Sequence, residues 1–345
     1  SYGMAEDYGK VLIIGLGYRT GFATAEFLCS RGVDVTVSDI KSEPELSAII
    51  MKLDPSVKVI AGSQEPSILD AGFDLVVLSP GVPAAIPLVQ EAYKRNVPVI
   101  SEVELAFRNM KGLFIGITGT DGKSTTTSLT GHILKELGFE TFVGGNIGIP
   151  LISFADKTGD RSVTVIELSS FQLETTDRFK PDVAAILNVT PDHLDRYSSI
   201  EDYFSAKKRI FMRQDNSDFF IYNRDNSILE NSRKDYPSCT LTFSTEDESA
   251  DSFFRDDLIH VVFEGSVIPV VETAKLGILG IHNIQNVMAA VLMVVSLHRK
   301  LGIIPDFMKI AEACCSFRGL EHRMEYAGEF MGRSFINDSK ATTIG

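Results

Sequence analysis

The chain has 345 residues, which is more than a single hydrophobic core usually organises, so at least two domains are expected. Its composition, with 44% hydrophobic and 23% charged residues, is that of a globular protein. A net charge of -13 at pH 7 argues against a nucleic-acid partner, because phosphate backbones bind to basic surfaces. The four cysteines lack metal-ligand spacing, and neither a secretion signal nor an apolar stretch long enough to cross a membrane is visible. We therefore expect a reduced, cytoplasmic protein without a membrane partner.

Strand-like runs alternate with helical stretches in the N-terminal part of the chain. The runs KVLII (10–14), DVTVSD (34–39) and VPVIS (97–101) are separated by segments of helical periodicity such as 20–31. This alternation is typical of βαβ units in a parallel sheet. It predicts a Rossmann-like parallel-sheet domain, to which we assign residues 1–102.

A second α/β series follows. The run GLFIGITGT (112–120) precedes a helical segment, 123–137, and the strand-like runs VTVIELSS (163–170) and VAAILNVT (183–190) continue the pattern. The sequence therefore predicts a P-loop ATPase-type α/β domain over residues 103–319.

Two features extend this second domain and one follows it. Short β runs between 218 and 272 predict an added antiparallel sheet, and an apolar periodic helix is expected over 282–301. Beyond residue 323, two short alternating segments predict a hairpin. We assign residues 320–345 to the start of a truncated further domain.

The glycine-rich segment GITGTDGKST (116–125) lies between a predicted strand and a predicted helix. In a P-loop, the glycines let backbone N–H groups surround phosphates, the lysine reaches the β- and γ-phosphates, and the hydroxyl binds Mg²⁺. Lys123 and Ser124 take those places here, although Ile117 occupies the first glycine position of the usual pattern. The alternative is a glycine-rich turn without a ligand. The predicted ATP-binding residues of this segment are Gly119, Thr120, Asp121, Gly122, Lys123, Ser124 and Thr125.

A second glycine-rich segment, GLGYRTG (15–21), follows the first predicted strand, and Asp39 ends the second. The arrangement is similar to a dinucleotide-binding fingerprint, but its spacing is GxGxxxG rather than GxGxxG. We expect a site for a small anionic nucleotide rather than bound NAD. The alternative is a tight turn that only permits close helix packing.

Acidic, imidazole, amine and amide groups follow the predicted P-loop. Glu167 ends a predicted buried strand and is a candidate Mg²⁺ ligand, while His193 lies in the loop after the next strand. The residue types alone leave alternatives open. Glu167 could be a capping carboxylate, His193 a surface histidine and Lys207 a solvated helix lysine. Asn283 and Asn286 could cap the helix that follows.

Taken together, seven motifs occur in the order seen in the Mur ligase family, which the chain resembles over about two-thirds of its length. They are GTDGKST, ELSSFQLE, NVTPDHLDRY, AKKRIF, HNIQN, GLEHRMEY and INDSKAT. The segments GLGYRTG and SPGVP (79–83) look most like the D-glutamate-adding members of the family.

The resemblance implies catalytic roles for Lys123, Lys207 and His193. Lys123 and Ser124 would hold the ATP phosphates, and Ser124 and Glu167 would hold a first Mg²⁺ ion. His193 and Lys207 would serve a second Mg²⁺ ion, Lys207 as a carbamate, whose formation requires a neutral amine and so a lowered pKa.

Further residues match family positions that bind the two nucleotides. Beyond the P-loop, the ATP contacts would be Asn283, Asn286, Arg323 and Asp338. The UDP-substrate contacts would be Gly17, Thr20, Asp39, Lys41, Ser79, Gly81, Asn146, Ser169, Gln172 and His193.

The implied activity is ATP-dependent addition of D-glutamate to UDP-N-acetylmuramoyl-L-alanine through an acyl phosphate, in peptidoglycan precursor synthesis. Three small molecules would be its partners, and we expect a monomer. Alternatives are another Mur-type or folylpolyglutamate-type ligase, a nucleotide-dependent dehydrogenase, and a non-enzymatic ATP sensor. The segment INDSKATTIG (336–345) resembles the opening of the family's third domain. A protein ending there would be expected to bind the UDP-substrate without completing ligation.

Overall fold

The computed structural model describes residues 4–17, 19–146, 148–191 and 197–319, which form two compact units. Unit 1 consists of Ser1–Lys111, Ile149–Gly159 and Phe171–Phe179. Unit 2 consists of Gly112–Gly148, Asp160–Ser170 and Lys180–Gly345. The predicted hairpin after residue 323 and the segment 320–345 lie outside the described residues.

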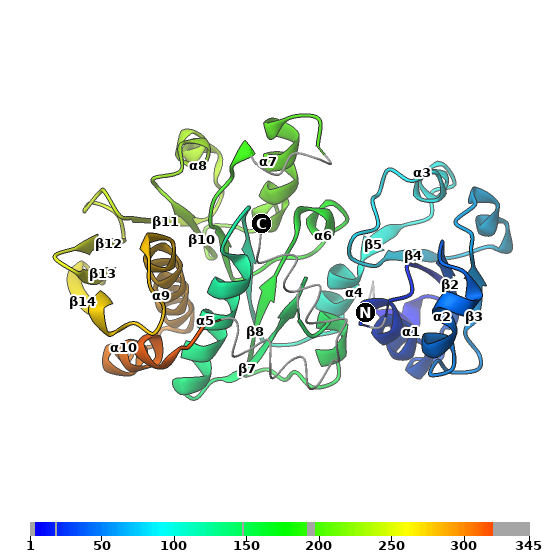
Figure 1. The fold of residues 1–345 in the computed structure, drawn as a ribbon, viewed down its shortest axis with the longest axis horizontal. Coiled ribbons are helices and arrows are strands. Elements are labelled where there is room, and N and C mark those ends of the chain that lie inside the picture. The colour runs from blue at the N-terminus through cyan, green and yellow to red at the C-terminus, as the bar shows by residue number, and fades with distance from the viewer. Residues whose placement is uncertain (1–3, 18, 147, 192–196, 320–345) are drawn as a thin grey trace. The chain divides into compact units, whose positions relative to one another are not determined.

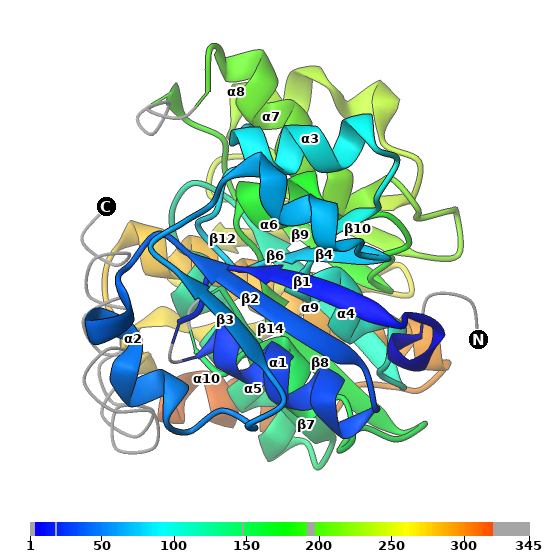
Figure 2. The ribbon, with the colours of Figure 1, turned by 90° about the vertical axis from the view of Figure 1, so that its right-hand side faces the viewer.

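Unit 1 contains a five-stranded sheet in the order β3-β2-β1-β4-β5. All four strand pairs are parallel, which confirms the predicted Rossmann-like sheet. Figure 2 shows β3, β2 and β1 side by side. The strands are β1 (Lys10–Ile14), β2 (Asp34–Asp39), β3 (Lys58–Ala61), β4 (Leu75–Leu78) and β5 (Val99–Ser101).

The sheet of unit 1 is covered on both faces. Successive residues of a strand point to opposite faces, and Val11–Ile14 of β1 and Leu75–Leu78 of β4 are buried without a break. One core cluster joins Leu12 and Val76 of the sheet to Leu88 and Val89 of a helix. The unit's elements are α1 (Thr20–Ser30), α2 (Glu43–Ile50), α3 (Pro87–Lys94), α4 (Glu102–Arg108), and the 3₁₀ turns η1 (Ala5–Asp7), η2 (Pro66–Ala71) and η3 (Leu151–Phe154). The helix α6 (Ser170–Glu174) begins at the last residue of a unit 2 segment and continues into unit 1.

Unit 2 contains a nine-stranded sheet in the order β14-β13-β12-β11-β10-β9-β6-β8-β7. Pairing is parallel from β7 through β12, and only β12–β13 and β13–β14 are antiparallel. The prediction that the runs after residue 218 add an antiparallel sheet is therefore wrong for its first two strands, which continue the parallel sheet. The strands are β6 (Leu113–Thr118), β7 (Glu140–Gly145), β8 (Ser162–Glu167), β9 (Val183–Ile186), β10 (Phe219–Asn223), β11 (Cys239–Ser244), β12 (Ser252–Arg255), β13 (Leu258–Phe263) and β14 (Ser266–Glu272).

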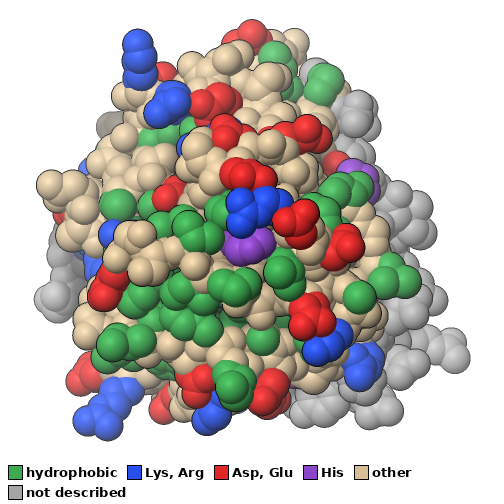
Figure 3. Space-filling view, turned by 90° about the vertical axis from the view of Figure 1, so that its left-hand side faces the viewer, with side chains coloured by type: hydrophobic (Ala, Val, Ile, Leu, Met, Phe, Trp, Pro, Cys, Tyr) green, Lys and Arg blue, Asp and Glu red, His purple; other side chains and the backbone are tan. Residues whose placement is uncertain are grey.

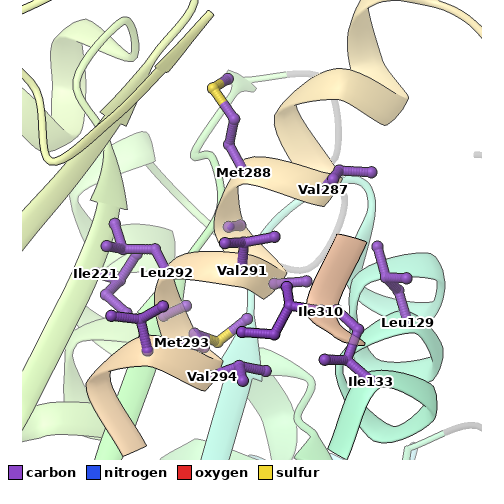
Figure 4. Packing of buried hydrophobic residues seen from close by; sticks show 14 of the residues in the cluster. Leu129, Ile133, Ile221, Val287, Met288, Val291, Leu292, Met293, Val294 and Ile310 are labelled. Carbon is purple, nitrogen blue, oxygen red and sulfur yellow. The ribbon is translucent and has the colours of Figure 1, made fainter. Parts of the chain in front are cut away.

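The core of unit 2 lies between its sheet and three helices. Figure 4 shows Leu129 and Ile133 packed near Val291 and Ile310, which come from three different helices. The first two of these helices, α5 and α9, pack against each other (Figure 1). The helices of the unit are α5 (Lys123–Glu136), α7 (Ile200–Lys208), α8 (Ser227–Asn231), α9 (Ile281–Leu301) and α10 (Phe307–Ser316), with 3₁₀ turns η5 (Arg209–Phe211), η6 (Arg233–Asp235) and η7 (Thr273–Lys275).

The helix α9 matches the predicted apolar helix. By length and composition it could cross a membrane, but 67% of its most apolar window is buried inside the protein. Twelve consecutive residues, from Val287 to His298, are buried in the structure. We therefore interpret α9 as a core helix of unit 2.

The outer face of unit 2 over β13, β14 and α10 carries hydrophobic side chains that lie together among scattered acidic and basic ones (Figure 3). Among the exposed large hydrophobic residues of this unit, Ile304 is 77% and Met308 75% exposed.

Candidate active site

The predicted phosphate loop connects β6 to α5 at the carboxyl edge of the larger sheet. Its conformation requires glycine at two positions: Gly119 has φ +153° and Gly122 has φ +85°. A Cβ atom on Gly119 would lie 3.1 Å from the Leu187 Cβ, and one on Gly122 would lie 2.6 Å from the Asn286 Oδ1. Side chains at either position would displace the neighbouring segments, so the glycines keep the loop tightly packed.

The first turn of α5 provides an anion site. Gly122 is the N-cap of this helix, and the N–H groups of a helix's first turn have no acceptor within the helix. These groups and the helix dipole favour a negatively charged ligand. The Lys123 Nζ donates to the Gly119 carbonyl oxygen at 3.0 Å, which places its charge over the loop.

Ser124 and Glu167 come together as predicted for a metal site. The Ser124 Oγ lies 3.0 Å and 3.1 Å from the two carboxylate oxygens of Glu167, to which it donates. Glu167 ends β8 and is 2% exposed. Gly145 permits close approach on the neighbouring strand, since a Cβ there would lie 2.2 Å from the Glu167 carbonyl oxygen.

Hydroxyl and carboxylate oxygens are ligands that Mg²⁺ prefers, so this pair fits the implied ion. Within the described ranges, no group of three or more His, Cys, Asp or Glu side chains could hold a metal on its own. A Mg²⁺ ion would therefore share its coordination among this pair, water and phosphate oxygens. His193 lies outside the described residues.

Lys207 is buried beside the same loop and is not the solvated lysine of the alternative interpretation. It lies on α7 and is 1% exposed. Its Nζ donates to the Gly119 carbonyl at 3.1 Å and to the Thr118 Oγ1 at 3.4 Å. Burial lowers the pKa of the Lys207 amine well below its usual value, and the charge of Lys123 lowers it further.

The amides of Asn283 and Asn286 lie in the first turns of α9, beside the phosphate loop. Neither caps the helix, whose N-cap is Gly280 without a side-chain cap bond. The Asn283 Nδ2 donates to the Leu279 carbonyl at 2.8 Å, and the Asn286 Nδ2 donates to the Asn283 Oδ1 at 3.2 Å. Arg323 and Asp338 lie outside the described residues.

The predicted UDP-substrate residues fall into two groups. In unit 1, the Asp39 carboxylate accepts the N–H groups of Leu16 and Lys41, both at 2.8 Å. The Ser79 Oγ donates to the Gly15 carbonyl at 2.6 Å. These bonds hold the glycine-rich loop, the end of β2 and the loop after β4 together. The remaining residues are Gly17 in the loop, Thr20 at the start of α1, and, in unit 2, Asn146 after β7 and Ser169 after β8.

A pocket of about 240 Å³, including its open mouth, lies in unit 1. It brings Ser79, Gly81 and Gln172 together, three of the predicted UDP-substrate residues. Its full lining is Leu78, Ser79, Pro80, Gly81, Val82, Ser101, Glu102, Phe171, Gln172 and Thr175.

Two residues at the phosphate loop escaped the sequence-based prediction. Tyr203 lies one helical turn before Lys207, and its ring is 4.6 Å from the Lys207 Nζ, while its hydroxyl is 3.1 Å from the Thr120 Oγ1. The spacing of four residues on a predicted helix could have indicated this neighbour. Asn188 hydrogen-bonds the loop from the end of β9, and its place after a buried strand was the available signal.

Comparisons with known proteins match the first and the middle part of the chain to described domain families. Residues 117–294 match the family described as "Mur ligase middle domain", and residues 9–101 match "Mur ligase MurD-like, N-terminal domain". The chain is 44% identical over 338 residues to a protein of Koribacter versatilis named UDP-N-acetylmuramoylalanine--D-glutamate ligase, covering 97% of this chain and 73% of that protein. A protein of the same name from Alkaliphilus metalliredigens is 40% identical, with 96% and 72% covered.

Solved structures share the fold. The crystal structure of a UDP-N-acetylmuramate:L-alanyl-gamma-D-glutamyl-meso-diaminopimelate ligase from Neisseria meningitides has a TM-score of 0.60 at 17% identity, covering 90% of this chain and 99% of that one. A murein peptide ligase from Psychrobacter arcticus has a TM-score of 0.58 at 18% identity, covering 92% and 70%. The fold, the two family matches and the near full-length similarity lead to one conclusion: the chain belongs to the Mur ligase family.

Proposed function

We propose that the chain is an ATP-dependent ligase that adds D-glutamate to UDP-N-acetylmuramoyl-L-alanine in peptidoglycan precursor synthesis. The observation that carries this proposal is the similarity over 97% of the chain to relatives named UDP-N-acetylmuramoylalanine--D-glutamate ligase. The contacts among Lys123, Ser124 and Glu167 at one sheet edge support the ATP-dependent step. The alternative of another Mur-type or folylpolyglutamate-type ligase would retain this edge and differ in the acceptor.

The reaction needs ATP because a carboxylate is a poor electrophile. Transfer of the γ-phosphoryl group to the free carboxylate of UDP-N-acetylmuramoyl-L-alanine gives an acyl phosphate, and the D-glutamate amine then displaces phosphate. In phosphoryl transfer, a protein contributes mainly alignment and stabilisation of negative charge. The site offers both, through the first turn of α5 and the Lys123 amine.

Each residue of the phosphate loop then has a role. The N–H groups at the start of α5 bind phosphate oxygens, and Lys123 neutralises charge on the transferred group. Ser124 and Glu167 would hold a Mg²⁺ ion, which would supply positive charge to the phosphate oxygens. Asn286 lies beside Gly122 and hydrogen-bonds Asn283, and both amides would contact the nucleotide, as Arg323 and Asp338 would from outside the described residues.

We assign Lys207 to the second Mg²⁺ ion as a carbamate, together with His193. Formation of the carbamate joins the amine nitrogen to the carbon of CO₂ and releases one proton. The geometry of Lys207 supports this role, since its buried Nζ donates to two oxygen atoms and has no carboxylate ion pair among the described residues. A lowered pKa leaves the amine neutral and nucleophilic. The product is an oxygen-donor anion suited to Mg²⁺.

Unit 1 would bind the UDP portion of the acceptor. The glycine-rich loop and the loop after β4 are joined by the Ser79–Gly15 bond, and Gly17, Thr20, Asp39, Lys41 and Gly81 surround them. The pocket beside Ser79 brings Ser79, Gly81 and Gln172, three of the assigned residues, together. Asn146, Ser169 and Gln172 would hold its muramoyl portion. We also assign residues 1–102, 103–319 and 320–345 to three domains, and the protein to the cytoplasm as a monomer.

Equilibrium titration of the complete protein with each nucleotide tests this function. Calorimetry with MgATP, UDP-N-acetylmuramoyl-L-alanine, a folate and NAD should give heats of binding for the first two only. Binding of NAD without binding of the UDP-substrate would favour a dehydrogenase. Binding of MgATP alone would favour an ATP sensor.

A further inference from the structure

The backbone that follows β9 runs alongside the first half of the phosphate loop. The Leu187 N–H donates to the Thr118 carbonyl at 2.9 Å, and the Thr120 N–H donates to the Asn188 carbonyl at 3.1 Å. The Thr190 N–H donates to the Thr120 Oγ1 at 3.1 Å. Residues 187–190 thus continue the parallel pairing of β9 with β6 beyond the end of both strands.

The Asn188 side chain adds three hydrogen bonds to this contact. Its Oδ1 accepts the N–H groups of Thr120 and Asp121, both at 2.8 Å. Its Nδ2 donates to the Asp121 carbonyl at 2.9 Å. A single side chain therefore binds both polar backbone groups of Asp121 and the N–H of the residue before it.

Only an amide side chain of this length can make these bonds. The two N–H groups need an acceptor and the carbonyl needs a donor, and Asn presents one of each on a single planar group. Asp would keep the acceptor and lose the donor, while Leu, of similar size, would lose both. A Gln side chain carries the same amide one methylene further out, which displaces both of its polar atoms from the positions that these bonds require.

We propose that Asn188 is a positioning residue of the nucleotide site: it holds the Thr120–Asp121 backbone so that phosphate binds the N–H groups of residues 122–125. This inference rests on the proposed ATP-dependent function and deepens it. The Thr120 and Asp121 N–H groups already donate to Asn188, so they do not point to a phosphate in this conformation. Gly122 and the first turn of α5 offer the adjacent N–H groups, which have no acceptor within the helix.

Holding the loop in advance should strengthen nucleotide binding. A loop that is ordered only on binding loses conformational entropy at that step, and Asn188 removes part of that loss by ordering the loop beforehand. Its contribution should appear mainly in the affinity for MgATP, because the hydrogen bonds of the Asn188 side chain seen among the described residues all go to the phosphate loop.

Hydrogen exchange of the complete protein without nucleotide tests the contact itself. The Asp121 N–H donates to the Asn188 Oδ1 at 2.8 Å. The Asp121 amide hydrogen should exchange at least about tenfold more slowly than it would in an unstructured peptide. Exchange at the unstructured rate in the wild-type protein would overturn the proposal without any variant being made. Since no ATP is present, this result is independent of whether the protein is a ligase.

Two variants separate positioning from general stability. Asn188→Leu should abolish protection of the Asp121 amide and weaken MgATP binding about tenfold to a hundredfold, whereas Asn188→Asp should keep the protection. Asn109→Leu is the matched control: Asn109 accepts the Ala5 N–H at 3.3 Å and donates to the Leu105 carbonyl at 2.7 Å, all within unit 1.

The control variant, Asn109→Leu, should retain wild-type affinity for MgATP. A folded Asn188→Leu protein with wild-type affinity for MgATP would contradict the proposal. Equal loss of protection in the Leu and Asp variants would also contradict it. Should Asn188→Leu fail to fold, the wild-type exchange and the Asp variant still decide the question. A wild-type protein that binds no MgATP would refute the proposed function, while the exchange experiment would still test the contact.

Discussion

The side-chain amines of Lys123 and Lys207 donate to the same backbone oxygen, the carbonyl of Gly119, at 3.0 Å and 3.1 Å. Two ammonium groups that share one acceptor repel each other; the Lys207 side chain is buried and that of Lys123 is half-buried. Burial lowers the pKa of each amine, and the charge of Lys123 lowers the pKa of Lys207 further. Lys123 can therefore provide a cation for phosphate, and Lys207 a neutral amine for the proposed carbamate.

Replacing Lys123 by Ala should abolish ATP turnover and leave the fold intact. The loss should be about a hundredfold to a thousandfold or more, because the lysine stabilises charge that develops during phosphoryl transfer. The free energy of unfolding should change by less than about 1 kcal/mol. ADP release and urea unfolding measure the two effects. Lys135→Ala, an exposed position on the same helix, is the control. Normal turnover by a folded Lys123→Ala protein would refute the P-loop assignment.

Replacing Lys207 by Ala should inactivate the complete enzyme, and short carboxylic acids should partly restore it. The truncated side chain leaves space in which acetate or formate can supply the oxygen donors of the proposed carbamate. Lys208→Ala provides a matched control. Lys208 is the next residue of α7 and also lies over an aromatic ring four residues earlier, but it is only half-buried. Full activity of Lys207→Ala without added acid would assign the lysine a packing role only.

Replacing Glu167 by Gln should weaken the Mg²⁺ dependence of ATP binding. A neutral amide is a poorer ligand for Mg²⁺ than a carboxylate, so half-saturation should require about tenfold more Mg²⁺ or higher. Titration of nucleotide binding against Mg²⁺ measures the change. Glu140→Gln is the control, since Glu140 also accepts a serine hydroxyl, that of Ser162 at 2.8 Å, at the opposite edge of the same sheet. Equal Mg²⁺ dependence in both variants would contradict the metal assignment.

Glu102 should make the protein less stable as pH rises from about 5 to 7. Its carboxyl group is 1% exposed and accepts the Ile152 N–H at 2.8 Å. Burial raises the pKa of this carboxyl from 4.5 to about 7, so the folded protein binds more protons than the unfolded chain between these values. Stability is then fully present below the unfolded pKa and falls as pH rises, by about 1.4 kcal/mol per unit and about 3 kcal/mol over the window.

Urea unfolding at several pH values checks this expectation against Glu102→Gln. The glutamine keeps an acceptor for Ile152 and cannot ionise. The difference in free energy of unfolding between the two proteins should shift in favour of the variant as pH rises through the window. A difference that does not vary between pH 5 and 7 would show that the carboxyl is not protonated preferentially in the folded state.

The sequence predicted elements whose signals are local. The strand β1 matches its predicted range, and the glycines at 119 and 122 lie where the phosphate loop requires them. Glu167 was predicted at the end of a strand, and parallel pairing of β6 with β8 brings that end to the phosphate loop. Where chemistry follows the carboxyl ends of parallel strands, sequence order is enough to assemble it.

Features that depend on pairing over long distances were missed. Short apolar runs do not encode the direction in which β10 and β11 pair, and the parallel outcome depends on their neighbours in the sheet. The helix α4 begins directly after a strand, and its EVELAFR sequence also fits a strand. The Asn188 contact joins residues 67 and 68 positions apart: its place after a buried strand indicated the sheet edge, but no local pattern specified its bonds to Thr120 and Asp121.

The most direct test of the central claim is an ADP-release assay of the complete protein with MgATP, UDP-N-acetylmuramoyl-L-alanine and a panel of amino acids, with the product identified by mass spectrometry. The account predicts ADP release that requires the UDP-substrate together with D-glutamate, and a product heavier by one glutamyl residue. L-glutamate, D-alanine and diaminopimelate should give little product. Ligation of a different amino acid, or ADP release that is independent of the UDP-substrate, would contradict the account.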